Sequence, residues 1–434
     1  MNSTECSDRP NRVILLTSPS TYRATPFMEA AARLGLEVVQ AVDLPAALAE
    51  YWNVPLGVDF KAPEAAAEKL IAHARRQPVG AVISVDDSAS LIAALVADAL
   101  GLPHNSPEAA LAARDKHLMR QRFAAAGVPS PAFARYELDA DPATLAAQVR
   151  YPCVVKPQVL SGSRGVIRAD SAEEFVAAFT RTVRLLRSLG FAPGTTGVLV
   201  EEYIPGREVA LEGLLTGHGL KVLALFDKPD PLEGPFFEET IYVTPSRLPG
   251  AVQAAIVECA SAAAAALGLR TGPVHAELRV NERGPFMLEV AGRSIGGLCS
   301  QTLRFGTDMS LEELILRQAF GFEVESLSRV GSAGGVMMIP IPGAGILRCV
   351  EGIEEAGAVP GVEGVEITAR IDHRLVPLPE GASYLGFIFA RGERPEEVEG
   401  ALREAHRRLR FRIDEELPVI NPVVGGDPGL AVIQ

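Results

Sequence analysis

The sequence VHAELRVNERGPFMLEVA spans residues 274–291 and predicts an antiparallel hairpin of two strands. With residues 281–285 as the loop, Val280 lies opposite Phe286, and Glu277 lies opposite Glu289. Because successive side chains of a strand point to opposite faces, the hairpin has one apolar face and one polar face. The apolar face consists of Ala276, Leu278, Val280, Phe286, Leu288 and Val290, and the other face carries His275, Glu277, Arg279, Met287 and Glu289.

This pairing places the carboxylates of Glu277 and Glu289 side by side, about 5 Å apart. If both are ionised with nothing between them, their repulsion costs about 3 kcal/mol at an effective dielectric constant of about 20. A positive group is therefore expected between them. Two interpretations stay open: Arg279 or Arg293 neutralises the pair, or a nucleotide-bound Mg²⁺ does, because Mg²⁺ prefers oxygen ligands.

A lysine ends a second apolar strand, in the sequence VVKP at 154–157, and a loop of serine and glycine follows at 161–165. A lysine on a strand is usually an exposed edge residue, which is one interpretation of Lys156. Beside a nucleotide, the same lysine would place its ammonium on a phosphate, and the glycines would let backbone N–H groups approach the phosphates. The loop by itself is also compatible with a plain turn.

The sequence VLVEEYI at 198–204 continues a third strand into an extended segment. Its apolar side chains and backbone hydrogen-bonding groups suit the edge of an adenine ring. Glu208 follows shortly afterwards, and it is either an acceptor for ribose hydroxyls or an exposed, solvated carboxylate.

The composition indicates a globular protein of several domains, because 434 residues exceed one ordinary hydrophobic core. The net charge of −13 argues against nucleic acid as a partner, since a polyanion would be repelled. No apolar run reaches the ~20 residues of a membrane span, and the polar N-terminus lacks a signal-peptide pattern. We therefore expect no membrane partner and a cytoplasmic location. The five cysteines are scattered and odd in number, which disfavours disulfides and a zinc site.

Strand and helix patterns alternate over the first hundred residues, with strands at 12–20, 37–41 and 81–85 and helices at 26–34 and 90–100. This alternation predicts a Rossmann-like parallel α/β domain at 1–112. A helix that contains Asp115 and Lys116 is expected at 111–123. The remaining chain is divided into a domain at 113–325, with a lid at about 113–197 and a catalytic core at about 198–325, and a small α+β domain at 326–434.

Several of these motifs stand in the order and spacing of the ATP-grasp ligases, which the chain resembles over residues 1 to about 325. The matching motifs are RDKH around Lys116, Lys156 with its loop, EEYI at 201–204 with Gly206 and Glu208, and Glu277 with LEVAGR at 288–293. Within that superfamily the sequence is similar to the L-amino acid ligases, and residues 331–410 resemble their small C-terminal domain. One departure is Ala291, which stands where many relatives have an asparagine that binds a further metal ion.

The resemblance implies an ATP-grasp fold of α/β and α+β class, preceded by the Rossmann-like domain and followed by the α+β domain. It implies ATP and Mg²⁺, or Mn²⁺ in its place, as cofactors. The implied reaction joins small amino-acid-type carboxylate and amine substrates by an amide bond, in a dipeptide-like product. An acyl phosphate is the intermediate, and ADP and phosphate are released. A homodimer is the assembly that we expect.

The resemblance also implies a role for each matching residue. The phosphates of ATP are expected to contact Lys116, Lys156, Ser161, Gly162, Ser163 and Gly165, and its nucleoside to contact Glu201, Glu202, Tyr203, Ile204 and Glu208. The expected Mg²⁺ ligands are Glu277 and Glu289, and the expected catalytic residues are Arg293 and Lys156. Substrate is expected to contact Arg293, His275, Gly296 and Gly297.

Other roles stay open for some of these residues. Arg293 is either a cation for the acyl phosphate or a charge partner of the carboxylate pair. His275 either accepts the proton of the amine or is a packing and hydrogen-bonding residue. Gly296 and Gly297 either approach a substrate carboxylate or form a simple turn.

Asp86 and Asp87 end a predicted strand, where open α/β sheets bind ligands, although both also suit the cap of the next helix. For the protein as a whole, three alternatives remain. They are a phosphoribosylamine ligase, a carboxylase-like enzyme and a non-enzymatic ATP-binding protein.

Overall fold

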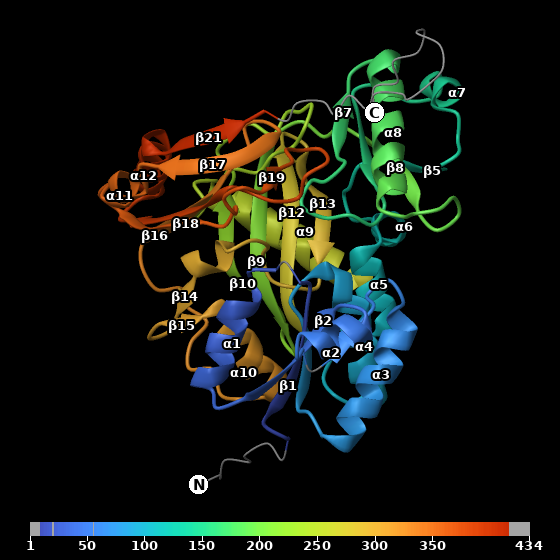
Figure 1. Ribbon diagram of the computed structural model, residues 1–434. Helices are drawn as coiled ribbons and strands as arrows, with labels where there is room; N and C mark the ends of the chain where they lie inside the picture. Colours follow the sequence, from blue (N-terminus) through green and yellow to red (C-terminus); the bar gives the residue numbers. More distant parts are fainter. Residues whose placement is uncertain (1–8, 20, 55, 416–434) are drawn as a thin grey trace, which may run out of the picture.

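The computed structural model describes residues 9–19, 21–54 and 56–415 (Figure 1). The expectations for the polar N-terminal residues 1–8 and for 416–434 of the C-terminal domain lie outside the described residues.

A parallel sheet with the strand order β3-β2-β1-β4 forms the N-terminal part, as the alternating patterns predict. Its elements are β1 (Arg12–Thr17), α1 (Ala24–Arg33), β2 (Glu37–Asp43), α2 (Ala46–Tyr51), β3 (Leu56–Val58), α3 (Pro63–Arg76), β4 (Ala81–Ser84) and α4 (Ser90–Leu100). Val13 and Leu15 share a core cluster with residues of α1, whereas Ile14 and Leu16 share one with residues of α3 and α4. The continuous apolar run of β1 therefore arises because helices cover both faces of the sheet.

Two helices follow where a single helix at 111–123 was predicted: α5 (Pro107–Arg114) and α6 (Lys116–Ala126). Asp115 separates them with an extended backbone, and its side chain caps α6 by accepting hydrogen bonds from the N–H groups of His117 and Leu118. This correction makes Lys116 the first residue of α6.

The lid is a four-stranded antiparallel sheet at the upper right of Figure 1, with the strand order β5-β8-β6-β7. Its elements are β5 (Phe133–Glu137), α7 (Pro142–Ala146), β6 (Cys153–Pro157), β7 (Ile167–Ala169), α8 (Ala172–Ser188) and β8 (Gly197–Glu202). Phe175 and Phe179 of α8 pack against Val155 and Val198 of the sheet. Because β6 is an inner strand and Lys156 is only 7% exposed, the interpretation of Lys156 as an exposed edge lysine is wrong.

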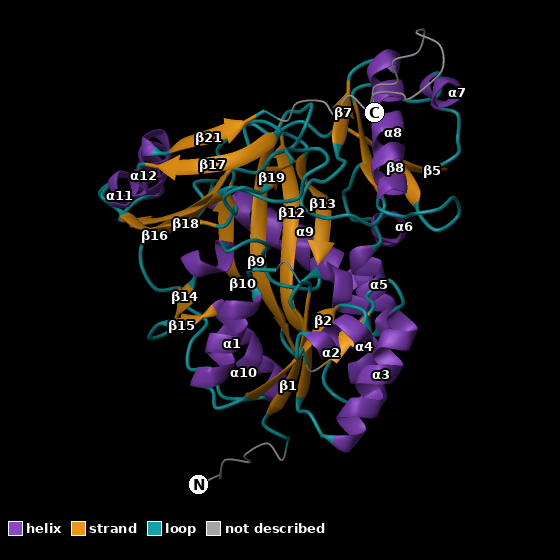
Figure 2. Ribbon diagram, viewed as in Figure 1, coloured by secondary structure: helices purple, strands orange, loops and turns teal. Residues whose placement is uncertain are grey.

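An eight-stranded antiparallel sheet forms the centre of the molecule (Figure 2). In spatial order its strands are β13 (Gly284–Ala291), β12 (Gly272–Asn281), β9 (Arg207–Thr216), β10 (Gly219–Asp227), β11 (Ile241–Thr244), β16 (Ala333–Ile339), β20 (Gly386–Gly392) and β18 (Val362–Ile367). The last three strands come from the C-terminal region. The sheet therefore continues across the boundary expected near residue 325.

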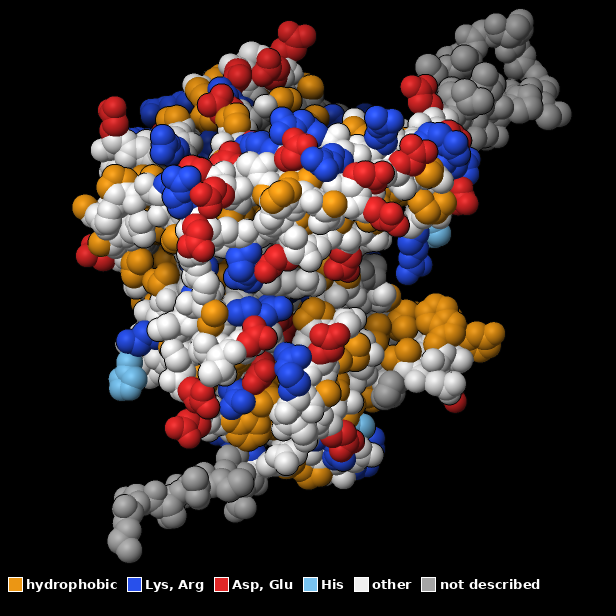
Figure 3. Space-filling model, turned by 90° about the vertical axis from the view of Figure 1, so that its left-hand side faces the viewer, with side chains coloured by type: hydrophobic (Ala, Val, Ile, Leu, Met, Phe, Trp, Pro, Cys, Tyr) orange, Lys and Arg blue, Asp and Glu red, His pale blue; other side chains and the backbone are white. Residues whose placement is uncertain are grey.

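The remaining elements surround this sheet. Helix α10 packs against α1, and β14 pairs with β15, whereas β19, β17 and β21 form a small sheet of their own. Their bounds are β14 (Arg304–Phe305), β15 (Met309–Ser310), α10 (Leu311–Phe320), β17 (Gly345–Glu351), α11 (Ile353–Gly357), β19 (Arg374–Leu375), α12 (Pro395–Arg408) and β21 (Arg410–Asp414). On the side of the molecule seen in Figure 3, acidic and basic side chains are interspersed.

One helix of the described part, α9 (Gly250–Leu267), is long and apolar enough to span a membrane by length and composition alone. Its residues Ile256, Ala260 and Leu267 lie in a core cluster with Val274 and Val290 of the hairpin. Helix α9 thus covers one face of the central sheet.

The predicted hairpin is confirmed as β12 and β13, with Glu277 directly opposite Glu289. Its loop is shorter than predicted, because residues 282–283 alone connect Asn281 to its partner Gly284. Gly284 has a φ of +105°, a conformation that suits glycine in a tight turn.

The shorter loop leaves one extra residue on β13, which forms a bulge between the turn and the carboxylate pair. In consequence, Met287 is fully buried in the core cluster under α9, and Leu288 lines the cleft on the other side. The faces predicted for these two residues were wrong, although the pairing that matters for the site was right.

Candidate functional site

A cleft of about 530 Å³ lies where the parts of the chain meet. The N-terminal sheet contributes Asp87, the lid contributes Lys156, the central sheet contributes Glu277, and the C-terminal region contributes Tyr384. Every predicted site residue except Gly165 lines this cleft. Gly165 instead packs beside Pro157, and its N–H points to the C-terminal region.

A buried ionic group lies under the lid sheet. The ammonium of Lys156 is 2.6 Å from Oε2 of Glu201, and Nε of Arg120 is 2.7 Å from Oε1 of the same carboxylate. Burial and the neighbouring cations lower the pKa of Lys156 to about 8, although Glu201 opposes the shift. Two cations share one carboxylate, so the group as a whole carries positive charge toward the cleft. The carboxylate of Glu201 is thus already bound, whereas that of Glu202 is 47% exposed.

Lys116 joins the residue before the serine–glycine loop at 161–165 to the carboxylate pair. Its Nζ donates to the carbonyl oxygen of Leu160 at 2.7 Å and to Oε1 of Glu289 at 3.1 Å. Lys116 is the first residue of α6, and its side chain is buried in the wall of the cleft. Glu289 therefore has a cation beside it.

The carboxylate of Glu277 has two other cationic partners. Nε2 of His275 lies 3.3 Å from Oε1 of Glu277, and Nζ of Lys228 lies 3.6 Å from the same oxygen. Burial alone would raise the pKa of Glu277, but Lys228 and His275 outweigh it and hold that pKa well below its usual range. The ion pairs of Arg279 and Arg293 are with Glu208 and Asp87 instead, and Arg293 contributes to the carboxylate pair only through its electrostatic interaction with Glu289.

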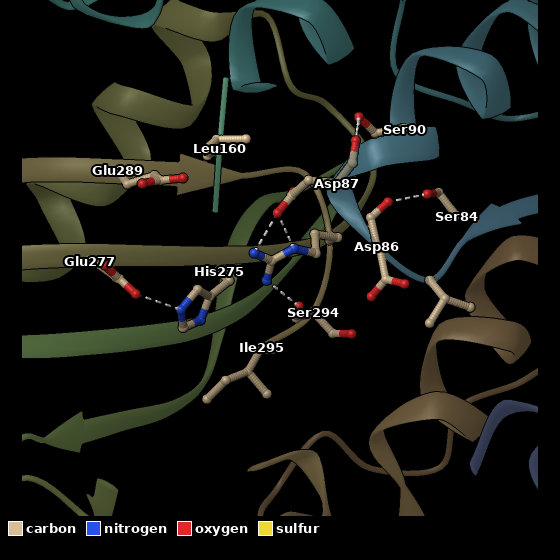
Figure 4. A network of polar contacts seen from close by, with 12 residues as sticks. Ser84, Asp86, Asp87, Ser90, Leu160, His275, Glu277, Glu289, Ser294 and Ile295 are labelled. Carbon is tan, nitrogen blue, oxygen red and sulfur yellow. Dashed lines mark hydrogen bonds and ion pairs between the residues drawn. The ribbon is translucent and has the colours of Figure 1, made fainter. Parts of the chain in front are cut away.

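His275 is held between two carboxylates. Its Nδ1 lies 3.2 Å from Oε2 of Glu212, and its Nε2 contacts Glu277 (Figure 4). Burial opposes a charged ring, but the two carboxylates outweigh it and raise the pKa of His275 to about 9. Both ring nitrogens already face a carboxylate, so neither is free to accept the proton of an amine. The geometry favours the hydrogen-bonding role that the sequence left open.

Arg293 is bound by Asp87 from the N-terminal sheet. Its Nε and Nη2 donate to Oδ2 of Asp87 at 2.8 and 2.6 Å, and its Nη1 donates to the carbonyl oxygen of Ser294 at 2.8 Å. Burial would raise the pKa of Asp87, but Arg293 outweighs it and lowers that pKa. Three of the five N–H groups of a guanidinium are used in this way, which leaves two for a ligand. In Figure 4, Asp87 approaches from the helix beside β4.

Asp86 enters the same end of the cleft. It accepts hydrogen bonds from Ser18 at 3.2 Å and from Arg23 at 3.4 Å, and Nη2 of Arg23 also donates to Oγ of Ser294 at 2.7 Å. The side chain of Asp86 makes no capping hydrogen bond to the short helix that follows it. Both aspartates at the end of β4 therefore face the cleft, as strand ends of open α/β sheets do.

A second ionic cluster, which the sequence did not predict, lies next to Glu277. Lys228, whose side chain is 2% exposed, lies 2.8 Å from Oε1 of Glu208 and also contacts Glu239. Oxygens of Glu208, Glu239 and Glu277 lie within 4.8 Å of one another, a spacing that could hold a metal ion. The ammonium of Lys228 lies among them. Glu208, expected at the ribose, also accepts from Nε of Arg279 at 2.9 Å.

Lys228 and Glu239 were missed because both lie in an irregular connection between β10 and β11. The one available signal was their position, since Lys228 directly follows the end of β10 and Glu239 stands two residues before β11. Tyr242 of β11 adds a hydrogen bond from its hydroxyl to Oε1 of Glu239, at 2.8 Å.

The end of the cleft beside Arg293 is wide. A Cβ atom added to Gly296 would meet nothing within 4 Å, so the backbone there is open to a ligand. Gly297 has a φ of +62°, and a Cβ there would lie 3.0 Å from the ring of Phe387. Aromatic side chains that sequence analysis did not select, Tyr22 and Tyr384, line the same end.

Three protein families match consecutive parts of the chain. Residues 28–104 match the ATP-grasp N-terminal domain, residues 149–302 match the ATP-grasp domain, and residues 337–414 match the L-amino acid ligase C-terminal domain 2. The order is the one that the sequence motifs indicate.

Individual proteins are also similar to this chain in sequence. An uncharacterised protein of Sinorhizobium fredii, y4rH, is 26% identical over 382 residues, which cover 88% of this chain and 73% of that protein. Alanine–anticapsin ligase of Bacillus subtilis is 29% identical over 229 residues, but the match covers only 49% of this chain and 48% of that ligase.

A solved structure extends the similarity to the whole fold. The L-amino acid ligase of Bacillus licheniformis superposes with a TM-score of 0.79 at 28% identity, over 94% of this chain and all of that one. A carboxyaminoimidazole ribonucleotide synthase from Aspergillus clavatus, at 18% identity and a TM-score of 0.70, shares the fold. The chain therefore contains an ATP-grasp domain between regions that match the ATP-grasp N-terminal domain and the L-amino acid ligase C-terminal domain 2, and its whole fold resembles that of an L-amino acid ligase.

Proposed function

We propose that the protein uses ATP to join the carboxylate of one small amino-acid-type substrate to the amine of another, releasing ADP and phosphate. The observation that carries this proposal is the arrangement of one cleft. Lys116, Lys156, Glu277, Glu289 and Arg293 all line this cleft, and Lys116 contacts Glu289 directly. The cleft thus brings together cations for phosphates, oxygen ligands for a metal ion and a cation for a reacting carboxylate.

The phosphate end suits a nucleotide. Lys156 brings positive charge that Glu201 does not fully compensate, and Lys116 lies beside the loop at 161–165. Gly162 of that loop has a φ of +64°, which allows backbone N–H groups of the loop to point into a concave site, whereas the N–H of Gly165 donates to the carbonyl oxygen of Pro379. The extended backbone at 201–204 would hold the nucleoside.

The carboxylate pair fits Mg²⁺, or Mn²⁺ in its place. Glu277 and Glu289 lie opposite each other on neighbouring strands and offer oxygen ligands, and phosphate and water would complete the shell. The partners of the pair, Lys116, Lys228 and His275, place positive charge beside both carboxylates, as a bound cation would. When bound, Mg²⁺ would offset the negative charge of the phosphates.

In the proposed reaction, an oxygen of the substrate carboxylate bonds to the γ-phosphorus, and the bond to ADP breaks. The amine nitrogen then bonds to the acyl carbon, the carbon–oxygen bond to phosphate breaks, and the amine loses a proton. Negative charge develops on the acyl oxygen during this second step. Arg293, held by Asp87 with two N–H groups left over, is placed to stabilise it.

The test is incubation with ATP, Mg²⁺ and pairs of amino acids, followed by mass analysis of nucleotide and product. We expect ADP, phosphate and an amide with the summed mass of both substrates minus water. AMP and pyrophosphate would overturn the acyl phosphate mechanism. Phosphate release that requires added bicarbonate or phosphoribosylamine, and not a pair of amino acids, would indicate another ATP-grasp chemistry, and ATP binding without phosphate release would indicate a non-enzymatic role.

A further inference from the structure

A segment of the C-terminal region, residues 376–384, crosses from the C-terminal strands to the lid. We call this segment the clasp. It connects β19 to β20, and its last residues, Ala382, Ser383 and Tyr384, line the cleft. The clasp therefore belongs to the wall of the site, although it lies far from the ATP-grasp motifs in the sequence.

The clasp contacts the outer side of the serine–glycine loop at 161–165, which we call the phosphate loop. The N–H of Gly165 donates to the carbonyl oxygen of Pro379 at 2.7 Å, and Nε of Arg164 donates to the carbonyl oxygen of Glu380 at 2.7 Å. Arg181 of α8 donates two hydrogen bonds to the carboxylate of Glu380, at 2.6 and 2.8 Å. Loop and lid helix are thus tied to one short segment.

The backbone of the clasp is held in a tight turn by its own hydrogen bond and by close packing. The N–H of Gly381 donates to the carbonyl oxygen of Pro377 at 2.8 Å, and a Cβ at Gly381 would lie 1.8 Å from the carbonyl oxygen of Val376. Directly after the clasp, the N–H of Leu385 donates to the carbonyl oxygen of Ile339 at 2.9 Å, at the end of β16. The central sheet anchors the segment.

The phosphate loop needs such support. Ser163 has a φ of +54°, between two glycines that also have positive φ values, Gly162 and Gly165. A left-handed conformation is unfavourable for serine, so the loop does not hold this shape through its own local preferences. The hydrogen bonds from the clasp add to two internal ones, from the N–H of Arg164 to the carbonyl oxygen of Ser161 at 3.4 Å and from the N–H of Val166 to that of Ser163 at 3.1 Å.

We propose that Glu380 is a positioning residue, which keeps the phosphate loop closed over the cleft through Arg181 until the amine has reacted. This inference rests on the proposed ligase function. Water that reaches the acyl phosphate bonds to its acyl carbon, phosphate leaves with the bonding electrons, and the carboxylate substrate is regenerated. An open loop would therefore consume ATP without forming an amide.

The test compares Glu380→Arg with the wild type. The variant places a cation against Arg181, and we expect the ratio of ADP released to amide formed, and the KM for ATP, each to rise about two- to five-fold. The double variant Glu380→Arg with Arg181→Glu restores the ion pair with its charges exchanged, and it should bring both quantities back toward the wild type. A purely structural role would lower activity without changing the ratio of ADP to amide.

A matched control exists in the same region. Glu363 binds Arg391 at 2.8 Å with side chains 46% and 28% exposed, which is comparable to the 39% and 44% of Glu380 and Arg181. Glu363→Arg makes the same change in charge away from the lid and should leave the ratio unchanged. An unchanged ratio in Glu380→Arg, or an equal rise in Glu363→Arg, would overturn the proposal.

Limited trypsin digestion separates this proposal from the proposed function, because it needs no catalysis. The bond after Arg164 lies in the phosphate loop, and Arg164 is held by the clasp. We expect faster cleavage there in Glu380→Arg than in the wild type or Glu363→Arg. If the wild type makes no amide, the ligase function is refuted, but a difference in cleavage rate would still support the role of Glu380. Equal cleavage rates in the wild type and Glu380→Arg would refute the proposal that Glu380 keeps the loop closed.

Discussion

Asp87 and Arg293 lie 206 positions apart in the chain, yet the guanidinium of Arg293 donates two hydrogen bonds to a single carboxylate oxygen of Asp87. The contact joins the end of a strand in the N-terminal sheet to the end of β13 in the central sheet. It shows that the N-terminal domain completes the candidate active site. The orientation of Arg293, the residue that we propose stabilises the developing oxyanion, depends on this contact.

Asp87→Asn should therefore lower kcat by about 10- to 100-fold, because a charge-assisted contact of roughly 1.5–3 kcal/mol is weakened where the oxyanion develops. The KM for ATP should change by less than about two-fold, since the proposed phosphate contacts, Lys116 and Lys156, pair with Glu289 and Glu201 and not with Asp87. Steady-state kinetics with saturating amino acids give both numbers. A change in KM without a change in kcat would show that Asp87 does not act through Arg293.

Glu289→Gln should abolish turnover, because one of the two oxygen donors proposed for Mg²⁺ loses its charge. Its effect on stability should be small, within about 1 kcal/mol. The change removes the repulsion with Glu277 and at the same time the 3.1 Å contact with Lys116. Activity and the unfolding midpoint should be measured together, with Glu282→Gln in the turn of the same hairpin as the control. A destabilised but active Glu289→Gln would falsify the metal assignment.

Lys156→Met should weaken ATP binding by about 10- to 100-fold, the loss expected for one charge-assisted hydrogen bond to a phosphate. The fold should survive, because Arg120 remains as a partner of the buried Glu201 at 2.7 Å. Calorimetric titration of ATP into the variant measures the loss. Lys221→Met, which removes an exposed lysine of β10, is the control and should bind ATP as the wild type does.

His275 should make stability fall as the pH rises from about 6.5 to about 9, the range between its ordinary pKa and the raised value. The folded state binds this proton more tightly than the unfolded state, so the stabilisation is complete below the range and lost above it. The difference in stability between wild type and His275→Gln should be on the order of 3 kcal/mol at pH 6 and shrink toward pH 9.

Thermal unfolding midpoints of both proteins across this range test the prediction. Lys156, whose pKa burial lowers to about 8, contributes with the opposite sign, but its contribution cancels in the difference between the two proteins. His218→Gln, at an exposed histidine, should show no such dependence. A difference that stays constant with pH would mean that the ring is not protonated between its two carboxylates.

Local patterns in the sequence were sufficient for much of this protein. The alternation along 274–291 predicted the pairing of Glu277 with Glu289, because cross-strand neighbours in a hairpin are close in sequence. The apolar run at 13–16 predicted a buried parallel strand, and the ordered motifs indicated the superfamily that the comparisons support. These features depend on periodicity and spacing, which a sequence displays directly.

Tertiary structure alone decided the length of the hairpin loop and the partners of the charges. A two-residue turn was as compatible with the local sequence as a five-residue loop, and the choice places Met287 in the core beneath α9. The partner of Arg293 is Asp87, and the partner of Arg181 is Glu380, 199 positions away. A charged side chain accepts any opposite charge within reach. Which one is within reach depends on how distant strand ends and loops are brought together, and no local pattern records that.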